Sequence, residues 1–414
     1  MARRLFAGAG RRWLPFIVLL FIGVSPAAAQ TATPEPEPDA EATMRFGPFA
    51  LRSTIALTNV GVDTNVFNAA DVENPQSDFT MTFTPTTDWW LRMGRTWING
   101  RVDVDWVYYR RFASERSANS EYAVGVSRTF NRLALKGGAR RLATRDRPGF
   151  EIDARSQRVE TDWDGLVEMR VLAKTYVGAK ALQGKTAFDK AAVFRDVNLA
   201  LELDRTRTMR SVVVRHLWTP LTTVSLEIGR EAERYVFSSL RDADSTRMTG
   251  TVNFQPLALV GGNATIGYRG YTPLSASVPA FRGLTTAMNL SYRLFGTTRL
   301  GLQAARDVQP SFEIDQPYYL ESGLNFSAQQ QVFGPFDVLG RIGRRRLAYR
   351  DRVGAPVDLS NRTDRIREVG IGVGYRLGTD KRFGVTLDRQ SRTSTLDGVG
   401  YSGARLGVSL TYER

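Results

Sequence analysis

The chain contains a single histidine and no cysteine, which limits the chemistry that its side chains can perform. A mechanism with a histidine base must use His216, the only histidine present. In the segment 212–218, His216 alternates in step with Val212, Val214 and Trp218, so in a strand it shares their apolar face. A base on such a face has no pocket in which to bind a substrate. The pattern predicts an interfacial structural role for His216 and no enzyme activity.

Metal and cofactor sites lack a matching set of ligands in this sequence. One histidine and no cysteine do not favour a transition-metal site. Asp71, Glu73 and Asp78 lie close together, but their spacing differs from that of the EF-hand calcium loop, so we interpret them as solvated loop charge. No glycine-rich phosphate loop joins a strand to a helix. We therefore expect neither a metal nor a cofactor.

Arginines are the strongest candidates for a binding role, because three groups of them lie next to long polar loops. The groups are Arg140, Arg141, Arg145 and Arg147; Arg341, Arg344, Arg345, Arg346, Arg350 and Arg352; and Arg362, Arg365 and Arg367. Outward members would pair with lipopolysaccharide phosphates, and inward members would line a mouth that attracts anions. The alternative is a ladder of salt bridges with acidic side chains on neighbouring strands. The predicted basic rim or lumen lining comprises Arg140, Arg141, Arg145, Arg341, Arg344, Arg345, Arg346 and Arg350.

The elements that must position these arginines are predicted to be β-strands with one apolar face. In the last stretch, Leu406, Val408, Leu410 and Tyr412 alternate with small or polar residues. Elsewhere the second face carries charges in the middle of strands, and tryptophans lie near strand ends, which favours a transmembrane barrel over a soluble sandwich. An exposed last strand would promote aggregation, so we expect it to pair with the first strand and close the barrel.

Turn signals divide the chain into eighteen predicted strands. They span 49–59, 77–91, 95–111, 119–130, 132–145, 156–169, 174–186, 193–218, 221–235, 244–254, 258–271, 281–294, 297–309, 317–330, 335–350, 362–377, 381–393 and 401–413. The longest, 193–218, contains an alternation from Val197 to Asp204 and a turn-like stretch at 204–208. We keep it whole, because bacterial barrels close with an even number of strands. Short connections then alternate with long polar ones, as expected for periplasmic turns and extracellular loops.

The N-terminal region predicts export. Basic residues Arg3, Arg4, Arg11 and Arg12 precede an apolar core and Ala27–Ala29, the pattern of a secretory signal peptide over residues 1–29. Residues 30–47 are rich in proline and acid and predict a disordered periplasmic tether, and 48–414 form the barrel. The formal charge of +14 would indicate nucleic acid in a cytosolic protein. In an exported one, it favours anionic lipid or an anionic solute over nucleic acid.

Several short motifs resemble one family of bacterial outer-membrane proteins. The segment 57–68, LTNVGVDTNVFN, resembles the opening signature of the putative β-barrel porin 2 group. Further similarity lies in WTPLT at 218–222, LRDADS at 240–245, QPYY at 316–319 and RTDR at 362–365. The resemblance implies an outer-membrane barrel of many strands, associated with exopolysaccharide secretion, and supplies no catalytic residues. The chain departs from the usual ending, because its last residue is Arg414 rather than an aromatic.

Together these observations predict an outer-membrane channel for an anionic solute or an exported exopolysaccharide. A barrel of eighteen strands is wide enough for an aqueous lumen. One alternative is a general diffusion porin, which needs an inward-folded loop; no segment stands out, the longest candidate being 60–76. Another is a structural barrel filled with charged side chains. The expected partners are outer-membrane lipid and lipopolysaccharide, the barrel assembly machinery and polysaccharide export proteins.

Overall fold

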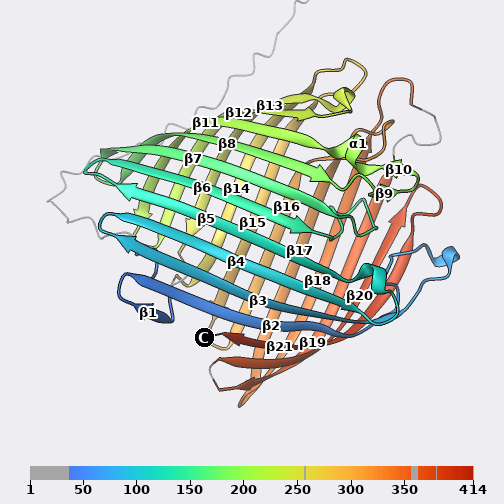
Figure 1. Ribbon diagram of the computed structural model, residues 1–414, viewed down its shortest axis with the longest axis horizontal. Helices are drawn as coiled ribbons and strands as arrows, with labels where there is room; N and C mark the ends of the chain where they lie inside the picture. The colour runs from blue at the N-terminus through green and yellow to red at the C-terminus, as the bar shows by residue number, and fades with distance from the viewer. Residues whose placement is uncertain (1–36, 256–257, 356–361, 379, 414) are drawn as a thin grey trace, which may run out of the picture. The chain divides into compact units, whose positions relative to one another are not determined.

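The structure, a computed structural model, describes residues 37–255, 258–355, 362–378 and 380–413, and within them eighteen long strands form one closed antiparallel barrel (Figure 1). Each strand pairs with the next along the chain, and the last pairs with the first. The strands are β2 (Phe49–Asp63), β3 (Asp78–Met93), β4 (Thr96–Tyr109), β5 (Ser117–Thr129), β6 (Leu133–Thr144), β7 (Arg158–Leu172), β8 (Thr175–Phe188), β11 (Arg205–Thr219), β12 (Thr222–Tyr235), β13 (Ala243–Phe254), β14 (Val260–Pro273), β15 (Phe281–Leu294), β16 (Thr298–Pro310), β17 (Tyr318–Phe333), β18 (Phe336–Arg350), β19 (Thr363–Leu377), β20 (Lys381–Ser394) and β21 (Tyr401–Glu413). The predicted fold class and strand number are confirmed. The signal peptide 1–29 lies outside the described residues.

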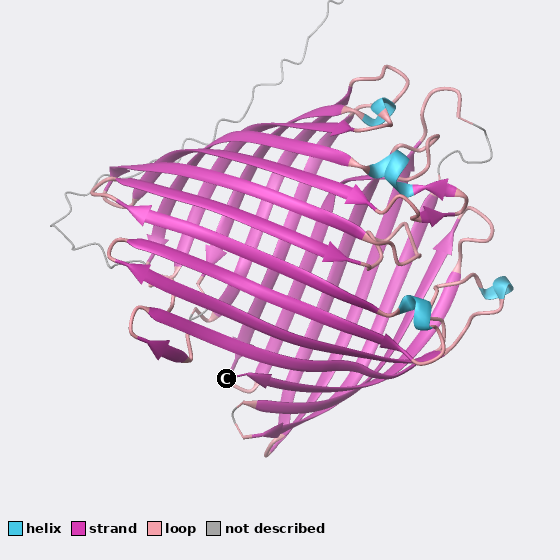
Figure 2. Ribbon diagram, in the orientation of Figure 1, coloured by secondary structure: helices cyan, strands magenta, loops and turns pink. Residues whose placement is uncertain are grey.

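The two ends of the barrel differ, because short turns gather at one end and long loops at the other (Figure 2). We call them the turn end and the loop end. The loop end also carries α1 (Leu199–Leu203), the short strands β9 (Val193–Phe194) and β10 (Val197–Asn198), and the 3-10 turns η1 (Asp71–Glu73), η2 (Ala113–Glu115) and η3 (Ser239–Arg241). No helix in the described ranges is long and apolar enough to cross a membrane. In barrels of this class the loop end faces the cell exterior.

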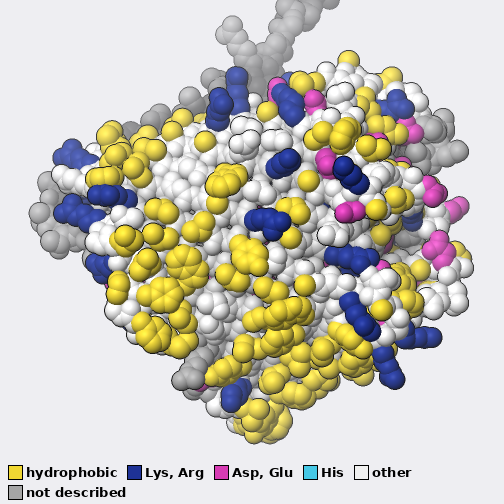
Figure 3. Space-filling model, in the orientation of Figure 1, with side chains coloured by type: hydrophobic (Ala, Val, Ile, Leu, Met, Phe, Trp, Pro, Cys, Tyr) yellow, Lys and Arg dark blue, Asp and Glu magenta, His cyan; other side chains and the backbone are white. Residues whose placement is uncertain are grey.

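Side chains alternate between the outer surface and the lumen as the sequence pattern predicts. On β12, Leu226 and Ile228 are more than half exposed on the outside, at 55% and 56%, whereas Glu231 is 4% exposed on the inside. Hydrophobic side chains spread over the outer surface of the strands, while acidic ones gather toward the loop end (Figure 3). Exposed apolar residues on this scale are the surface of a protein that is solvated by lipid.

The barrel closes where β2 pairs with β21, which confirms the predicted partnership of the first and last strands. The register shifts between Leu57 and Val60, where Asn59 adopts a positive φ of 55°. Such a bulge bends the strand and increases its twist. Above it, Asp63 accepts hydrogen bonds from the guanidinium of Arg405, so an ion pair joins the two strands near the loop end.

The prediction of one strand over 193–218 is wrong in its first half. Residues 189–204 form a loop at the top of the barrel, and α1 occupies part of the stretch whose alternation suggested a strand. The Asn198 side chain caps this helix by accepting from the backbone N–H groups of Ala200 and Leu201. Strand β11 begins only at Arg205, so the strand count is unaffected.

The described part of the expected tether, residues 37–47, folds against the turn end. Met44–Phe46 forms β1, which pairs with the beginning of β2. Arg45 forms an ion pair with Asp39, and Arg92 of β3 donates to Glu37 at 2.8 Å. Acidic residues of this segment therefore form ion pairs with arginines. The composition of the segment predicted a disordered tether instead.

Candidate functional site

One loop crosses the mouth of the barrel. Residues 145–157, the crossing loop, connect β6 to β7, and they contact β17, β18 and β20 on the far wall. The sequence singled out no inward-folded loop, and the structure contains one. The longest candidate by sequence, 60–76, does not cross the mouth but serves as one of the supports of this loop.

The tip of the crossing loop is held by the buried carboxylate of Glu151. Ser311 Oγ donates to it at 2.6 Å, and the backbone N–H of Phe312 donates at 3.1 Å. Burial raises the pKa of Glu151 to about 7, since the charged form has lost its water. Part of the Glu151 population is therefore protonated near neutral pH.

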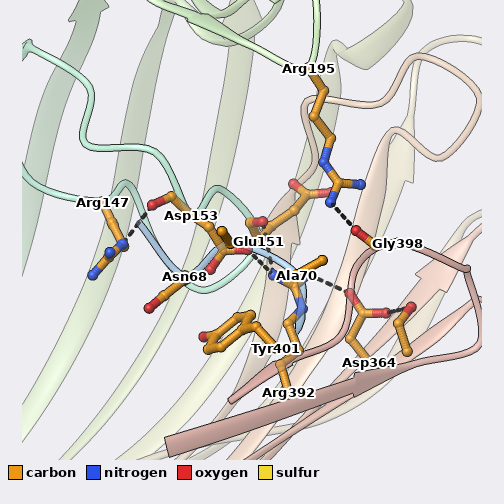
Figure 4. A network of polar contacts seen from close by, with 12 residues as sticks. Asn68, Ala70, Arg147, Glu151, Asp153, Arg195, Asp364, Arg392, Gly398 and Tyr401 are labelled. Carbon is orange, nitrogen blue, oxygen red and sulfur yellow. Dashed lines mark hydrogen bonds and ion pairs between the residues drawn. The ribbon is translucent and has the colours of Figure 1, made fainter. Parts of the chain in front are cut away.

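A buried ionic centre fixes the loop to β20 (Figure 4). Arg392, 2% exposed, donates from Nη1 to Asp153 Oδ2 at 2.6 Å and to the Glu151 carbonyl at 3.2 Å. Its Nη2 donates to Asp364 Oδ2 at 2.5 Å. Burial raises the pKa of Asp153. Since breaking a buried pair leaves an uncompensated charge, this centre is a strong latch for the loop.

The segment that resembles the family signature supports the same loop from the side. Asn65 is 2% exposed and its amide donates to the carbonyls of Ala69 and Ser402, which fixes the loop after β2. The Val66 carbonyl then accepts from Arg147 at 2.8 Å. Asn68 donates to Asp153 at 3.2 Å, and both residues are labelled in Figure 4. The motif thus builds a docking surface for the crossing loop.

A cluster of apolar side chains at the loop end covers another part of the mouth. It comprises Ile152, Phe188, Leu199, Ala200, Leu203 and Phe312. Arg241, 2% exposed, connects the loops that surround this cluster, because it donates to Glu202 at 2.9 Å and to the Phe312 carbonyl at 2.9 Å. Arg195 reaches the Gly398 carbonyl at 3.3 Å, which ties the loop 189–204 to the loop after β20. The loops therefore form a packed cap.

Beneath the crossing loop lies a polar cavity of about 720 Å³. It follows the inner wall from β15 to β21 and on to β2, and its lining extends from Arg147 at the loop end to Arg299 at the turn end. Its polar lining includes Asn59, Asp63, Asn65, Asn68, Arg147, Asn289, Arg299, Gln303, Asn325, Gln329, Arg341, Glu368, Asp388, Gln390 and Arg405. Most of these side chains are amides or arginines, so the wall can hydrogen-bond a polar solute along its length.

The predicted rim arginines divide between the two faces of the barrel. Arg140, Arg341 and Arg345 point into the lumen, where Arg140 donates to Glu121 at 2.8 Å, Arg341 donates to Asp388 at 2.7 Å and Arg345 pairs with Glu321. Their geometry fits the salt-bridge alternative. Strand alternation places Arg141, Arg344, Arg346 and Arg350 on the outer face. Arg145 lies in the crossing loop and pairs with Glu115 at 3.4 Å. Whether any of them acts as a rim stays a prediction.

His216 lies on the outer surface beside Trp218, at 6.5 Å between ring centroids, and its Nδ1 lies 2.9 Å from the hydroxyl of Thr175. This is the outward position that the alternation predicted. Sequence reasoning missed the crossing loop and the cavity lining. The available signals were Phe150 and Ile152, the two large apolar side chains of a loop in which most residues are charged or polar.

The family model described as Putative beta-barrel porin 2 matches residues 37–414. The chain belongs to this family. Members of the Putative beta-barrel porin 2 family are porin-like barrels of the bacterial outer membrane, and they are channels rather than enzymes. No curated protein matches the sequence.

Solved porins have similar structures. The outer-membrane protein OpdK of Pseudomonas aeruginosa shares 11% identity at a TM-score of 0.47, covering 88% of this chain and 99% of its own. A BenF-like porin from Pseudomonas fluorescens Pf-5 shares 10% identity at a TM-score of 0.49, covering 89% and 99%. OccK2 (OpdF) of Pseudomonas aeruginosa, solved in complex with glucuronate, shares 12% at 0.48, covering 88% and 98%.

Proposed function

We propose that the protein is an outer-membrane channel that selects small anionic solutes. The observation that carries the proposal is the amide- and arginine-lined cavity beneath the crossing loop. A volume of about 720 Å³ lies within the usual range of small-molecule sites. A solute of that size, with carboxylate and hydroxyl groups, would find hydrogen-bond partners along the whole wall.

The charges of the lining favour anions at its two ends. Arg147 donates only to backbone carbonyls, and neither Arg147 nor Arg299 forms an ion pair with any described residue. Arg341 and Arg405, between these ends, are neutralised by Asp388 and Asp63. Uncompensated positive charge at the entrance and exit of a narrow lumen raises the local anion concentration.

Reversal potentials in planar bilayers under a salt gradient test this selectivity. We expect the full-length mature protein to prefer anions, and Arg299→Glu to shift the reversal potential toward cation preference. Arg170→Glu is the matched control: Arg170 also lies at the turn end but on β7, outside the cavity lining. A cation preference in the wild type, or equal shifts in both variants, would count against the proposal.

The crossing loop also favours a second candidate, a general diffusion porin for small solutes, since such porins need a loop of this kind. The two candidate functions differ in whether the flux of solute saturates with concentration. A selective channel shows a solute flux that saturates with concentration and competition between chemically similar anions, whereas a diffusion porin shows neither.

Export of an exopolysaccharide, implied by the family resemblance, stays a prediction. A polymer would need the crossing loop and its latch at Arg392 to leave the mouth first. Genes for polysaccharide synthesis beside the gene of this protein, together with loss of secreted polymer on its deletion, would support that role.

A further inference from the structure

A cluster of arginines lies on the outer surface of the barrel, on strands β16 to β20 near the loop end. Arg344 of β18 is directly opposite Arg367 of β19, and Arg346 is directly opposite Arg365. Arg306 lies on the same row as Arg346, with Ser322 between them, and Arg389 lies beside Val369. These six residues, the outer arginine cluster, are all exposed.

The cluster lacks an acidic partner in the part of the chain that the structure describes. Outward positions of β16 to β20 carry no Asp or Glu, and no arginine of the cluster forms an ion pair with a described residue. Directly opposed side chains on neighbouring strands have Cβ atoms about 5 Å apart, and like charges at that distance repel. On the other side of the barrel, outward Arg234 does have a partner, Asp244 at 2.6 Å. The four central arginines thus form a concentrated positive surface that requires an external anion.

The position of the cluster indicates where that anion comes from. The next outward residues toward the turn end are Phe326, Ile342 and Val369, followed by further apolar side chains such as Ile371 and Leu387. Arginines at the upper edge of an apolar belt lie at the level of the lipid head groups. At the loop end, this level belongs to the outer leaflet.

We propose that the outer arginine cluster binds the phosphate groups of lipopolysaccharide, the phosphorylated glycolipid of that leaflet. Guanidinium groups bind phosphate oxygens in pairs, with strong charge-assisted hydrogen bonds. The square of Arg344, Arg346, Arg365 and Arg367 presents several such donors to one lipid. This proposal concerns the outer surface and does not depend on which solute passes through the lumen.

Titration of the full-length mature protein in neutral detergent with fluorescent lipopolysaccharide tests the proposal. We expect the variant with Arg344→Gln, Arg346→Gln, Arg365→Gln and Arg367→Gln to bind at least about tenfold more weakly, a loss of roughly 1.4 kcal/mol. The control replaces Arg141 and Lys185 by Gln; both are exposed and outward but are opposed by Thr161 rather than by another base. We expect its affinity to stay within about twofold of wild type.

Two further ligands test whether the cluster recognises the phosphate groups of lipopolysaccharide. Dephosphorylated lipopolysaccharide should bind as weakly to the wild type as intact lipopolysaccharide binds to the fourfold variant. Phosphatidylglycerol vesicles should compete poorly. Wild-type affinity in the fourfold variant, no effect of dephosphorylation, or equal competition by phosphatidylglycerol would overturn the proposal. If the fourfold variant fails to fold, as judged by its mobility in unheated gels, the same comparison is made with Arg344→Gln and Arg367→Gln alone.

Discussion

Arg392 Nη1 lies 2.6 Å from Asp153 Oδ2, so a strand of one wall holds a loop that leaves from another part of the barrel. Arg392 also donates to Asp364 on the neighbouring strand β19, and Asp364 forms a second ion pair with Arg362 at 3.1 Å. The position of the crossing loop is therefore linked to the buried ionic centre around Arg392.

Replacing Arg392 by methionine should release the crossing loop. Asp153 would lose the cation with which it forms an ion pair, and breaking a buried pair in this way costs roughly 3–5 kcal/mol. We expect larger single-channel conductance and faster proteolysis within 145–157. Lys185→Met, an exposed outward basic residue on β8 away from the cavity lining, is the control and should leave both unchanged. Wild-type conductance and protease resistance in the Arg392 variant would show that the ion pair does not hold the loop.

The latch should weaken as the pH rises. The pKa of Glu151 is about 7 in the folded protein, above its ordinary value of 4.5, so the folded state binds more protons between these two values. The contribution of Glu151 is therefore fully present below about pH 4.5 and falls by roughly 3 kcal/mol as the pH rises to 7 and above. We expect more frequent or larger openings at pH 8 than at pH 5. Glu151→Gln should remove most of this difference; a variant with the wild-type pH response would exclude Glu151 as its source.

Truncation of Leu199 should loosen the cap of loops without opening the barrel. Leu199 is 0% exposed, and removing its side chain leaves a cavity that costs about 2–5 kcal/mol in well-packed cores. Hydrogen exchange should accelerate in residues 189–204 and in 311–317, while exchange in the strands stays slow. Leu201→Ala serves as the control, because Leu201 lies on the same helix and is 51% exposed. Equal exchange in the two variants would contradict the packed cap.

A side chain at Gly61 should disturb closure of the barrel. A Cβ atom there would overlap with the carbonyl oxygen of Leu406 across the seam between β2 and β21. Gly61→Ala should therefore lower the temperature at which a sample, heated before electrophoresis, loses its folded band on the gel. Gly165→Ala, where a Cβ atom has no neighbour within 4 Å, should not change that temperature.

The strands could be predicted from the sequence because their pattern is local. Val224, Leu226 and Ile228 alternate with small or polar residues, and this pattern does not depend on the rest of the chain. The apolar face that they form then turns toward the lipid. The stretch 197–203 shows where this reasoning fails. Its leucines alternate, yet Leu199, Ala200 and Leu203 also share one face of a helix. The cap at Asn198 was the local sign that distinguishes the two.

The candidate site was harder to predict, since it depends on contacts between distant segments. Glu151 and Ser311 are separated by 160 residues, and neither lies in a periodic sequence pattern from which the contact could be predicted. For the arginines, alternation along β18 assigns Arg344 and Arg345 to opposite faces once the register is known. From the sequence alone, each of these arginines could face outward to the lipid or inward to the lumen. Only the strand register assigns each arginine to one face.

The seam between β2 and β21 has a consequence for biogenesis. Its ion pair joins Asp63 and Arg405, 342 residues apart, so β2 has no permanent neighbour on one side until the whole polypeptide has been exported. During that interval its exposed backbone is a template for wrong pairing with another molecule. A dedicated insertion factor that shields the first strand until the last one arrives would prevent such misassembly, and a chain truncated before β21 should be degraded rather than inserted.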